Sequence, residues 1–483
     1  MNIFFSNSAS EYLRKMTFLA GILLVVSCSS ETPDDPAPPE VEPQSETIVI
    51  YSINDPHGKI HNFGKIKAII DREKEKESQV FFVSGGDIFS GNPIVDYHSE
   101  KGFPIVDLMG KAGMDVSALG NHEFDYGQEV LQERMLDSEF PFLCANIETS
   151  TSGFTIPQGK LLLEKDGFEI AFISVVETSS ADNKPLSHPK KLQGLEFSEG
   201  VNAMAKYSND PEVMAADLVV AVTHYGRTGD RMILAQHDFV DLVVGGHNHA
   251  VYSEQVNGRY MVQSGSDLKV LTKLSLTVEA GKVTDYAHEL IYLDQVTETD
   301  EAVEELIAEY NNQPQFFVEI GTSLQNHNTA ETACFYTDAL RTLTGADVVF
   351  QNYGGIRAGL DYGSITPFDI YTIDPFQNGL DSFTMSVGEL EDFLNSSYAP
   401  SLAYAGIRME NRNGRKELIA ENGSNMSDNI QITVALSDYL SNVYAQDFQQ
   451  PTTTYEKTTA EYLIDYLQQH QSIIDNEGCN RGI

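Results

Sequence analysis

The sequence of 483 residues contains no tryptophan, few basic side chains and no long hydrophobic run. Lysine and arginine total 31 against 71 aspartate and glutamate residues, so the formal net charge is −40. A surface this acidic repels nucleic-acid backbones and anionic membranes, which argues against a DNA or RNA polymer as partner. Hydrophobic residues still make up 41% of the chain. Length and composition therefore indicate a globular protein of two large domains or three small ones.

A short apolar run near the N-terminus follows two basic residues. The run covers residues 16–26, which are too few to cross a bilayer, and we interpret residues 1–27 as a signal peptide. The four residues that end at Cys28, Val-Val-Ser-Cys, resemble a bacterial lipobox, which implies cleavage before Cys28 and lipidation of its sulfur. An ordinary cleaved signal peptide is the alternative. Residues 28–46 are rich in proline and acidic side chains and are predicted to form an extended, solvated linker.

Cysteine is scarce in the rest of the chain. If Cys28 is lipidated, only Cys144, Cys334 and Cys479 remain. An odd number of widely spaced cysteines argues against a disulfide framework, even in an exported protein. Cys144 follows an apolar run and is predicted to be a small buried core residue.

Short apolar runs in the first half of the chain are each followed closely by glycine, asparagine, aspartate or histidine. These predicted buried strands cover residues 47–53, 80–83, 116–119, 218–222 and 242–244. Helical patterns lie between them at 64–76, 105–112 and 128–137. The pattern predicts an α/β fold with helices on both faces of the sheet and functional residues at the carboxyl ends of the strands.

The second half of the chain begins with a change of pattern. Residues 258–294 are predicted to form two or three alternating strands, and the acidic segment 300–311 a connecting helix. We expect a first domain at 47–296, a connector at 297–320, a second mixed α/β domain at 321–475 and a polar tail at 476–483.

Five polar clusters follow the predicted strands of the first domain. They are Asp55-Pro56-His57, Gly86-Asp87, the run from Gly120 to Asp125, Thr223-His224, and the run from Gly245 to His249. One such cluster alone would more often be a turn or a structural histidine. Together they offer imidazole and oxygen ligands without thiolate, a set that suits two divalent transition ions. Pairs such as Asp55 and His57 are two residues apart, so an extended strand end would point both side chains to one side.

These clusters resemble the metallophosphoesterase signature, in the version shared by periplasmic 5'-nucleotidases, UDP-sugar hydrolases and 2',3'-cyclic-nucleotide phosphodiesterases that are also 3'-nucleotidases. The resemblance implies a calcineurin-like β-sandwich flanked by helices, followed by a C-terminal α/β substrate-binding domain. It also implies two divalent metal ions, zinc, manganese or similar. Asp55, His57, Asp87 and His249 would hold one ion, and Asp87, Asn121, His224 and His247 the other. His122, oriented by Asp125, would stabilise the transition state and protonate the leaving oxygen.

Two ions also suit the difficulty of the implied reaction. Phosphate monoester hydrolysis can require an acceleration of up to about 10²¹-fold, whereas one acid or base contributes only about 10² to 10⁴. A pair of ions can clamp the attacking and leaving oxygens and create a local positive site inside an acidic protein. An anionic substrate is therefore compatible with the net charge.

The second domain contains the run Asn-Tyr-Gly-Gly-Ile-Arg at 352–357, directly after a predicted strand at 347–350. Glycines would let the backbone approach a ligand, and arginine offers a planar fork to an anion. This run resembles part of the nucleotide-binding domain of the same family, which implies substrate contacts by Asn352, Gly355 and Arg357. Residues 323–331 lack the basic contact that the family has before the first helix of this domain, and its loss can change the preferred substrate.

The resemblance further implies that Phe376 forms one side of an aromatic clamp on the base. Without tryptophan, the other side must be phenylalanine or tyrosine. The nearest match to the family's second ring is Phe448, and Tyr444 is the alternative.

The leading hypothesis is an extracytoplasmic phosphohydrolase that releases phosphate from nucleoside 5'-monophosphates for scavenging, anchored by lipid to a bacterial outer membrane. A 2',3'-cyclic-nucleotide phosphodiesterase/3'-nucleotidase or a UDP-sugar hydrolase would use the same metal site. A nucleotide-binding lipoprotein with an inactive site is the alternative from another class. Seven histidines lie outside the clusters and are predicted not to bind metal: His61, His98, His188, His237, His288, His327 and His470.

Overall fold

The computed structural model describes residues 45–483 except residues 78, 280–281, 471 and 483. The expected signal peptide, Cys28 and most of the linker lie outside the described residues. Within the described part of the chain, no helix combines the length and the apolar character needed to cross a membrane.

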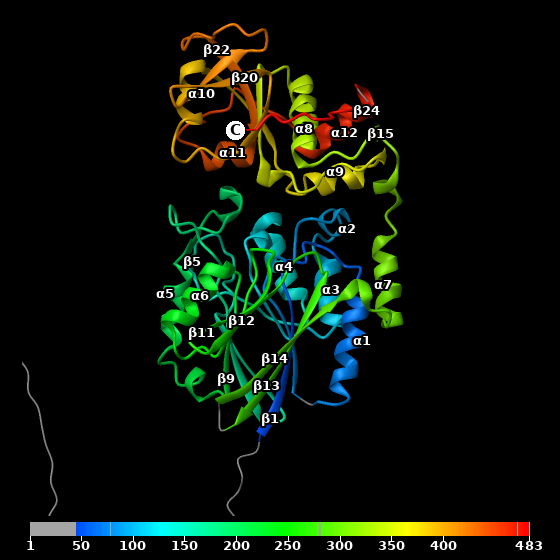
Figure 1. The fold of residues 1–483 in the computed structure, drawn as a ribbon, viewed down its shortest axis with the longest axis vertical. Coiled ribbons are helices and arrows are strands. Elements are labelled where there is room, and N and C mark those ends of the chain that lie inside the picture. The colour runs from blue at the N-terminus through cyan, green and yellow to red at the C-terminus, as the bar shows by residue number, and fades with distance from the viewer. Residues whose placement is uncertain (1–44, 78, 280–281, 471, 483) are drawn as a thin grey trace, which may run out of the picture. The chain divides into compact units, whose positions relative to one another are not determined.

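Two six-stranded sheets form the first lobe (Figure 1). The first sheet has the order β14 (Lys282–Tyr292), β13 (Val270–Glu279), β1 (Ser45–Ile53), β2 (Val80–Ser84), β3 (Val116–Ala118) and β4 (Phe142–Leu143). The second has the order β11 (Val251–Val256), β12 (Arg259–Ser264), β10 (Leu242–Val244), β9 (Leu218–Val222), β7 (Phe168–Ile173) and β6 (Lys160–Lys165). Strands β1 to β4 are mutually parallel, as are β7, β9, β10 and β12. Each set therefore presents its carboxyl ends at one edge.

The two sheets pack face to face because successive side chains of a strand point to opposite faces. Ile48 and Ile50 of β1 lie with Phe172 of β7 in an apolar core shared by both sheets. Val49 and Tyr51 of β1 lie in a different core, which includes residues of the outer helices. This alternation confirms the β-sandwich that the family resemblance implies.

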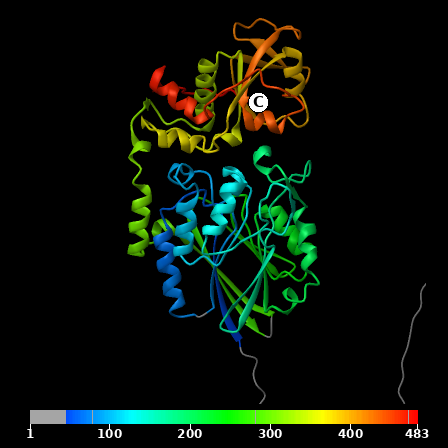
Figure 2. The ribbon, with the colours of Figure 1, turned by 180° about the vertical axis from the view of Figure 1, so that it is seen from behind.

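Helices cover the outer faces of the sandwich. Four helices lie between strands β1 and β4 in the chain: α1 (Phe63–Lys74), α2 (Pro93–Asp96), α3 (Phe103–Lys111) and α4 (Gln128–Asp137). Two more, α5 (Gly200–Met204) and α6 (Gly226–Gln236), lie between strands β7 and β10. Figure 1 shows α1 and α3 on one side of the strands and α5 and α6 on the other, and Figure 2 shows the same layers from behind. The expectation of one sheet with helices on both faces was wrong, because each sheet has helices on one face and the other sheet on its opposite face. A small ribbon of β5 (Ile147–Ser150) and β8 (Leu195–Phe197) completes this lobe.

The second lobe is also mixed α/β. Its main sheet has the order β19 (Leu402–Ala405), β16 (Val348–Asn352), β22 (Gln431–Ser437), β18 (Leu380–Ser386) and β23 (Thr453–Thr454). Smaller sheets contain β17 (Gly363–Ile365), β15 (Gly321–Ser323) and β24 (Ile473–Ile474), and β20 (Ile407–Arg412) with β21 (Arg415–Ala420). The helices are α8 (Thr329–Thr344), α9 (Pro367–Ile373), α10 (Val387–Leu394), α11 (Asp438–Val443) and α12 (Thr459–Gln469).

The predicted connecting helix is α7 (Glu301–Asn311), and the side chain of Asp300 caps it by accepting from the amide of Val303. Val303 and Ile307 are buried in the outer core of the first lobe. The Tyr310 hydroxyl donates to Asp107 of α3 at 2.9 Å. The connector is thus packed onto the first lobe along its length.

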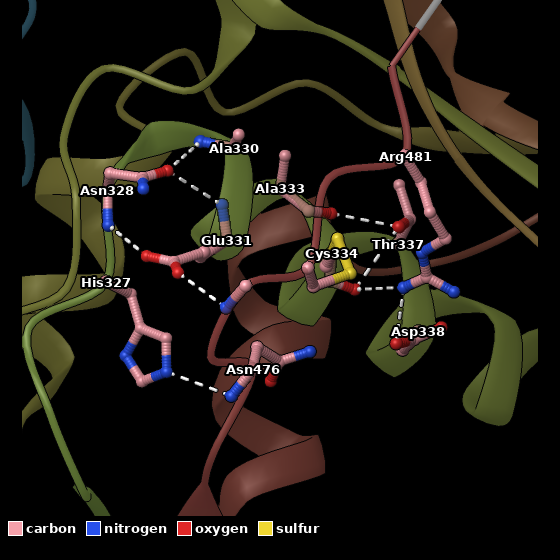
Figure 3. Close-up of a disulfide and its surroundings, with 12 residues drawn as sticks. His327, Asn328, Ala330, Glu331, Ala333, Cys334, Thr337, Asp338, Asn476 and Arg481 are labelled. Carbon is pink, nitrogen blue, oxygen red and sulfur yellow. Dashed lines mark hydrogen bonds and ion pairs between the residues drawn. A yellow bond between two sulfur atoms is a disulfide. The ribbon is translucent and has the colours of Figure 1, made fainter.

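A disulfide joins Cys334 of α8 to Cys479 (Figure 3). The expectation of no disulfide was wrong, because the chain folds back over 145 residues and places these two distant cysteines side by side. The last residues are also hydrogen-bonded to the lobe: the amide of Asn476 donates to His327 Nε2 at 3.0 Å, and Arg481 pairs with Asp338. The segment expected to be a polar tail is therefore fixed to α8.

The remaining described cysteine, Cys144, is free and buried, as predicted. Burial raises the pKa of its thiol to about 12, so almost no reactive thiolate exists at pH 8.

A thiol titration tests both statements on the soluble chain that begins after Cys28. At pH 8 we expect no reactive thiol in the native protein, one after denaturation without reductant, and three after denaturation with reductant. Three thiols in the unreduced, denatured protein would show that the disulfide is absent.

Candidate active site

All five polar clusters lie at the carboxyl ends of strands, as the sequence predicts. Asp55, Asp87 and Asn121 follow β1, β2 and β3 of the first sheet, whereas His224 and His247 follow β9 and β10 of the second. The site is therefore assembled from both sheets, at the edge where their parallel strands end.

The predicted ligands form three overlapping groups whose ligand atoms lie within 4.8 Å of one another. The groups are Asp55, His57 and His249; Asp87, His224 and His247; and His57, Asp87 and His122. The Nε2 atoms of His57 and His249 are 2.9 Å apart, and His224 Nε2 lies 3.0 Å from Asp87 Oδ2. Ring nitrogens and carboxylate oxygens thus converge from different strands on common points.

Unpartnered polar atoms show that these residues suit a metal ion. Asp55 Oδ1 and Asn121 Oδ1 are buried and have no hydrogen-bond partner. Buried polar atoms without a partner are costly, and a cation would satisfy them. The nitrogen and oxygen donors match first-row transition ions, so the residues fit the implied metal.

The charges of the site also favour a cation. Burial opposes a positive charge on His224, but Asp87 and other carboxylates outweigh the effect of burial and raise the pKa of His224 to about 10. Burial likewise opposes a charge on His122, which is partly buried, but Asp125 and Asp87 raise its pKa to about 9. Burial and the neighbouring His122 instead lower the pKa of His57 to about 4. The carboxylates of the site therefore favour positive charge on the groups beside them, as they would favour a bound cation.

The backbone at the ligands is unusual. Asp55, His57, Asp87, His247 and His249 all have positive φ, between 47° and 86°. The expectation of extended strand ends was wrong here, because left-handed turns rather than strand alternation direct these side chains. His247 and His249 accordingly belong to different groups. Non-glycine residues in this conformation are uncommon, and their strain is typical of functional sites.

Glycine permits the close approach of two ligand loops. A Cβ at Gly120 would overlap the Asp87 carboxylate, and Gly86 has φ +84°. The two loops are joined by Glu123, which accepts hydrogen bonds from the amides of Asp87 at 3.0 Å, Ile88 at 2.6 Å, and Gly120. Glu123 lies in the predicted cluster from Gly120 to Asp125, but no motif indicated this bridging role.

The predicted dyad has the expected geometry. His122 Nδ1 lies 2.6 Å from Asp125 Oδ2, and the Ser187 hydroxyl donates to Asp125 Oδ1 at 3.2 Å. The other ring nitrogen, Nε2, lies 3.9 Å from Asp87 Oδ2. Asp125 thus fixes the ring so that Nε2 faces the ligand groups.

A cavity of about 150 Å³ adjoins the dyad. The first lobe contributes Asn121, His122, Asp125, Leu186, Ser187, His188 and Lys191, and the second contributes Asn352, Gly354, Gly355, Arg357, Phe376, Asn378 and Tyr439. The rings of Phe376 and His122 are stacked, with centroids 5.7 Å apart. Four of the five predicted substrate-binding residues therefore lie at this cavity.

The fifth predicted residue, Phe448, does not lie there. Its side chain is 3% exposed and packs between Phe383 and Phe393 in the core of the second lobe. The ring of the alternative residue, Tyr444, stacks on the ring of Tyr398 and also lies away from this cavity. The aromatic ring that does line it with Phe376 is Tyr439 of α11, which sequence analysis missed because no recognisable motif surrounds it.

The comparisons with known proteins agree with this geometry. Residues 48–251 match the family model of calcineurin-like phosphoesterases, and residues 307–447 match that of the 5'-nucleotidase C-terminal domain. The chain belongs to the two-domain 5'-nucleotidase family of metallophosphoesterases. It is a metal-dependent phosphoester hydrolase.

Individual relatives are distant in sequence. The chain is 25% identical to the 5'-nucleotidase of Vibrio parahaemolyticus, over 90% of this chain and 91% of that protein. It is also 25% identical to the endonuclease YhcR of Bacillus subtilis, over 73% of this chain but only 33% of that longer protein. The solved structure of a 5'-nucleotidase precursor from Thermus thermophilus has the same fold, with a TM-score of 0.77, 19% identity and coverage of 89% and 97% of the two chains.

This metallophosphoesterase also places an unpredicted cation at the cavity beside the dyad. Lys191 lies in the first lobe, and its ammonium donates to the Phe376 carbonyl at 3.3 Å. Burial lowers the pKa of Lys191, and Asp125 and Asp438 oppose that shift. His188 was predicted not to bind metal, and it is in none of the three ligand groups. It lines the same cavity, and its Nε2 lies 3.3 Å from Oδ2 of Asp438. The basic side chain absent from residues 323–331 was expected in the second lobe, whereas Lys191 of the first lobe lines the cavity.

Replacing the dyad histidine should separate chemistry from metal binding. His122→Ala should lower kcat for p-nitrophenyl phosphate by about 10² to 10⁴, with metal content near that of the wild type, measured by elemental analysis. His61→Ala, a change of an exposed histidine outside the ligand groups, is the control. Loss of metal in proportion to activity would make His122 a ligand instead.

Proposed function

We propose that this enzyme hydrolyses nucleoside 5'-monophosphates with two divalent ions. The observation that carries the proposal is the position of the dyad between two sets of residues. On one side lie the ligand groups that include Asp87, and on the other lies the cavity with Asn352, Arg357 and Phe376. A phosphoryl group at the ligands would leave its nucleoside beside the second lobe.

Each ion would be held by the residues that the family resemblance implies, with Asp87 shared between them. Bound ions would neutralise charge on the phosphoryl group and lower the pKa of a water molecule at the site. His122, with Nδ1 fixed by Asp125, can hold a proton on Nε2 and give it to the leaving oxygen. Outside the proposed ligand set, no other described histidine pairs with a buried carboxylate.

The second lobe supplies contacts for the rest of a nucleotide. Arg357 is exposed, and its guanidinium carbon lies 5.8 Å from the centroid of the Phe376 ring. An arginine in this position can bind phosphate oxygens. Phe376 and Tyr439 provide apolar walls on which a base of any kind can stack. Asn352 Oδ1 is buried without a partner and can accept a hydrogen bond from the nucleoside.

A second cavity supports an alternative substrate class. It has a volume of about 280 Å³ and is lined by His57, Lys59, His249 and Arg357 among others. Gly354 and Arg357 line both this cavity and the first one. The phosphorus of a 2',3'-cyclic nucleotide is held by two oxygens of one ribose, whereas in a UDP-sugar the two phosphorus atoms carry different groups on either side of an anhydride oxygen. The polar space of this cavity could take the group of a UDP-sugar that lies away from the first cavity.

We also propose that the enzyme works outside the cytoplasm on a lipid anchor at Cys28, for nucleotide scavenging. Only the sequence of residues 1–46 supports this part. Fractionation of cells that express the whole chain tests it: the protein should sediment with membranes, and Cys28→Ser should release it. Equal distribution of both forms would reject the anchor.

Phosphate release across a substrate panel tests the reaction. The soluble chain with manganese or zinc would be given AMP, 3'-AMP, 2',3'-cyclic AMP, UDP-glucose and p-nitrophenyl phosphate. A coupled phosphatase would be added for the cyclic nucleotide and UDP-glucose, whose first products are monoesters. We expect AMP to be turned over fastest and a chelator to abolish turnover. A preference for the cyclic nucleotide or UDP-glucose would favour the alternative class, and metal binding without any turnover would favour a nucleotide-binding protein.

The same assay can examine the aromatic wall. Phe376→Ala should raise KM for AMP by about tenfold, because stacking contributes about 1 to 3 kcal/mol per base, and should change KM for p-nitrophenyl phosphate much less. Phe317→Ala removes a half-exposed ring outside the cavity and serves as the control. Equal increases for both substrates would contradict base stacking.

A further inference from the structure

Glu177 contacts one of the candidate metal ligands through its side chain. Its Oε2 lies 2.6 Å from Nε2 of His247, and the other nitrogen of that ring, Nδ1, lies 3.1 Å from Nε2 of His224. The two nitrogens of His247 thus face different partners. If Nδ1 is the atom that binds a metal, it must carry no proton, so Nε2 would hold the proton and donate a hydrogen bond to Glu177.

The backbone of Glu177 contacts the second histidine of the same group. Its amide donates to the carbonyl of His224 at 2.8 Å, and the preceding Val176 forms a parallel bridge with His224. One residue therefore contacts His247 through its side chain and His224 through its main chain.

A buried asparagine fixes the position of Glu177. Asn146 is fully buried. Its Oδ1 accepts from the amide of Val176 at 3.0 Å, and its Nδ2 donates to the carbonyl of Val176 at 2.9 Å. The segment that carries Glu177 is thus held by two hydrogen bonds from a side chain in the interior of the lobe.

The other described ligand histidines have different partners. His224 Nδ1 lies 2.7 Å from the neutral carbonyl of Gly85. His249 has its Nε2 toward Asp55 and His57. Among the proposed ligand histidines, all of which the structure describes, His247 alone forms an ion pair with a carboxylate from outside the ligand set and the dyad. The two proposed ion sites therefore differ in their surroundings.

We propose that Glu177 is a positioning residue that holds His247 in its Nε2–H form and increases the cation affinity of the group Asp87, His224 and His247. This inference rests on the proposed metal centre. A carboxylate behind a metal-binding histidine fixes the ring and makes it a stronger donor, and removing such a partner typically lowers metal affinity about 10- to 100-fold. The side chain of Glu177 is 50% exposed, so solvent screens its charge and we expect the lower end of that range.

Binding of manganese to the ion-free, soluble chain tests the inference without substrate. We expect calorimetry to resolve two sites in the wild type. In Glu177→Ala one site should weaken by about tenfold or more while the other is unchanged. Glu177→Gln keeps an acceptor for the Nε2 proton but removes the charge, and should recover part of the lost affinity.

A neighbouring change controls for general disturbance of the loop. Thr178→Val alters the next residue, whose hydroxyl is buried without a partner, and should leave both affinities at the wild-type values. Thermal unfolding of each variant checks that the fold is intact. Equal manganese affinities in the wild type and both Glu177 variants would overturn the inference, as would the same loss in Thr178→Val. If the wild type itself binds no manganese or zinc, the proposed metal centre fails as well.

Discussion

The apolar seam between the two sheets is the constraint on which the active site depends. Ile50, Phe81, Phe172 and Val220 fill it from both sides. Because Asp55 and Asp87 come from one sheet and His224 and His247 from the other, the thickness of this seam sets the distance between the ligands that each group draws from the two sheets. Native packing is dense and hardly compressible, so the seam can hold ligands from opposite sheets at fixed distances. The chemistry thus relies on residues that never touch a substrate.

The active site favours positive charge, whereas the chain as a whole is strongly negative. The protein carries a formal net charge of −40, yet its buried carboxylates raise the pKa of His122 and His224 and so favour positive charge between the sheets. Arg357 and Lys191 add cations at the cleft. A phosphate group would therefore meet a local environment quite unlike the average surface. Net charge excludes some partners, but the local arrangement decides which anion can bind.

The first lobe was largely predictable, because its strands are short apolar runs that end in chemically distinctive residues. The residue types of the clusters, together with the family resemblance, named the ligand set from Asp55 to His249, and the fold brings most of it into three groups. The positive φ of five ligands could not be predicted, since aspartate and histidine adopt that conformation only when surrounding structure enforces it. Phe448 was misplaced because an aromatic residue in a loop-like segment can equally well fill a core. Lys191 and Tyr439 reach the cleft through tertiary packing, which no local pattern records.

The disulfide has a consequence for the order in which the chain acquires its structure. The chain emerges from its N-terminus, at a ribosome or at an export channel, so Cys334 precedes Cys479 by 145 residues. During that interval Cys334 is a thiol without its partner, and Cys144 of the first lobe has already emerged. Burial of Cys144 in the core of that lobe removes the one earlier described thiol with which Cys334 could form a wrong pair. Folding of the first lobe thus protects the oxidative folding of the second.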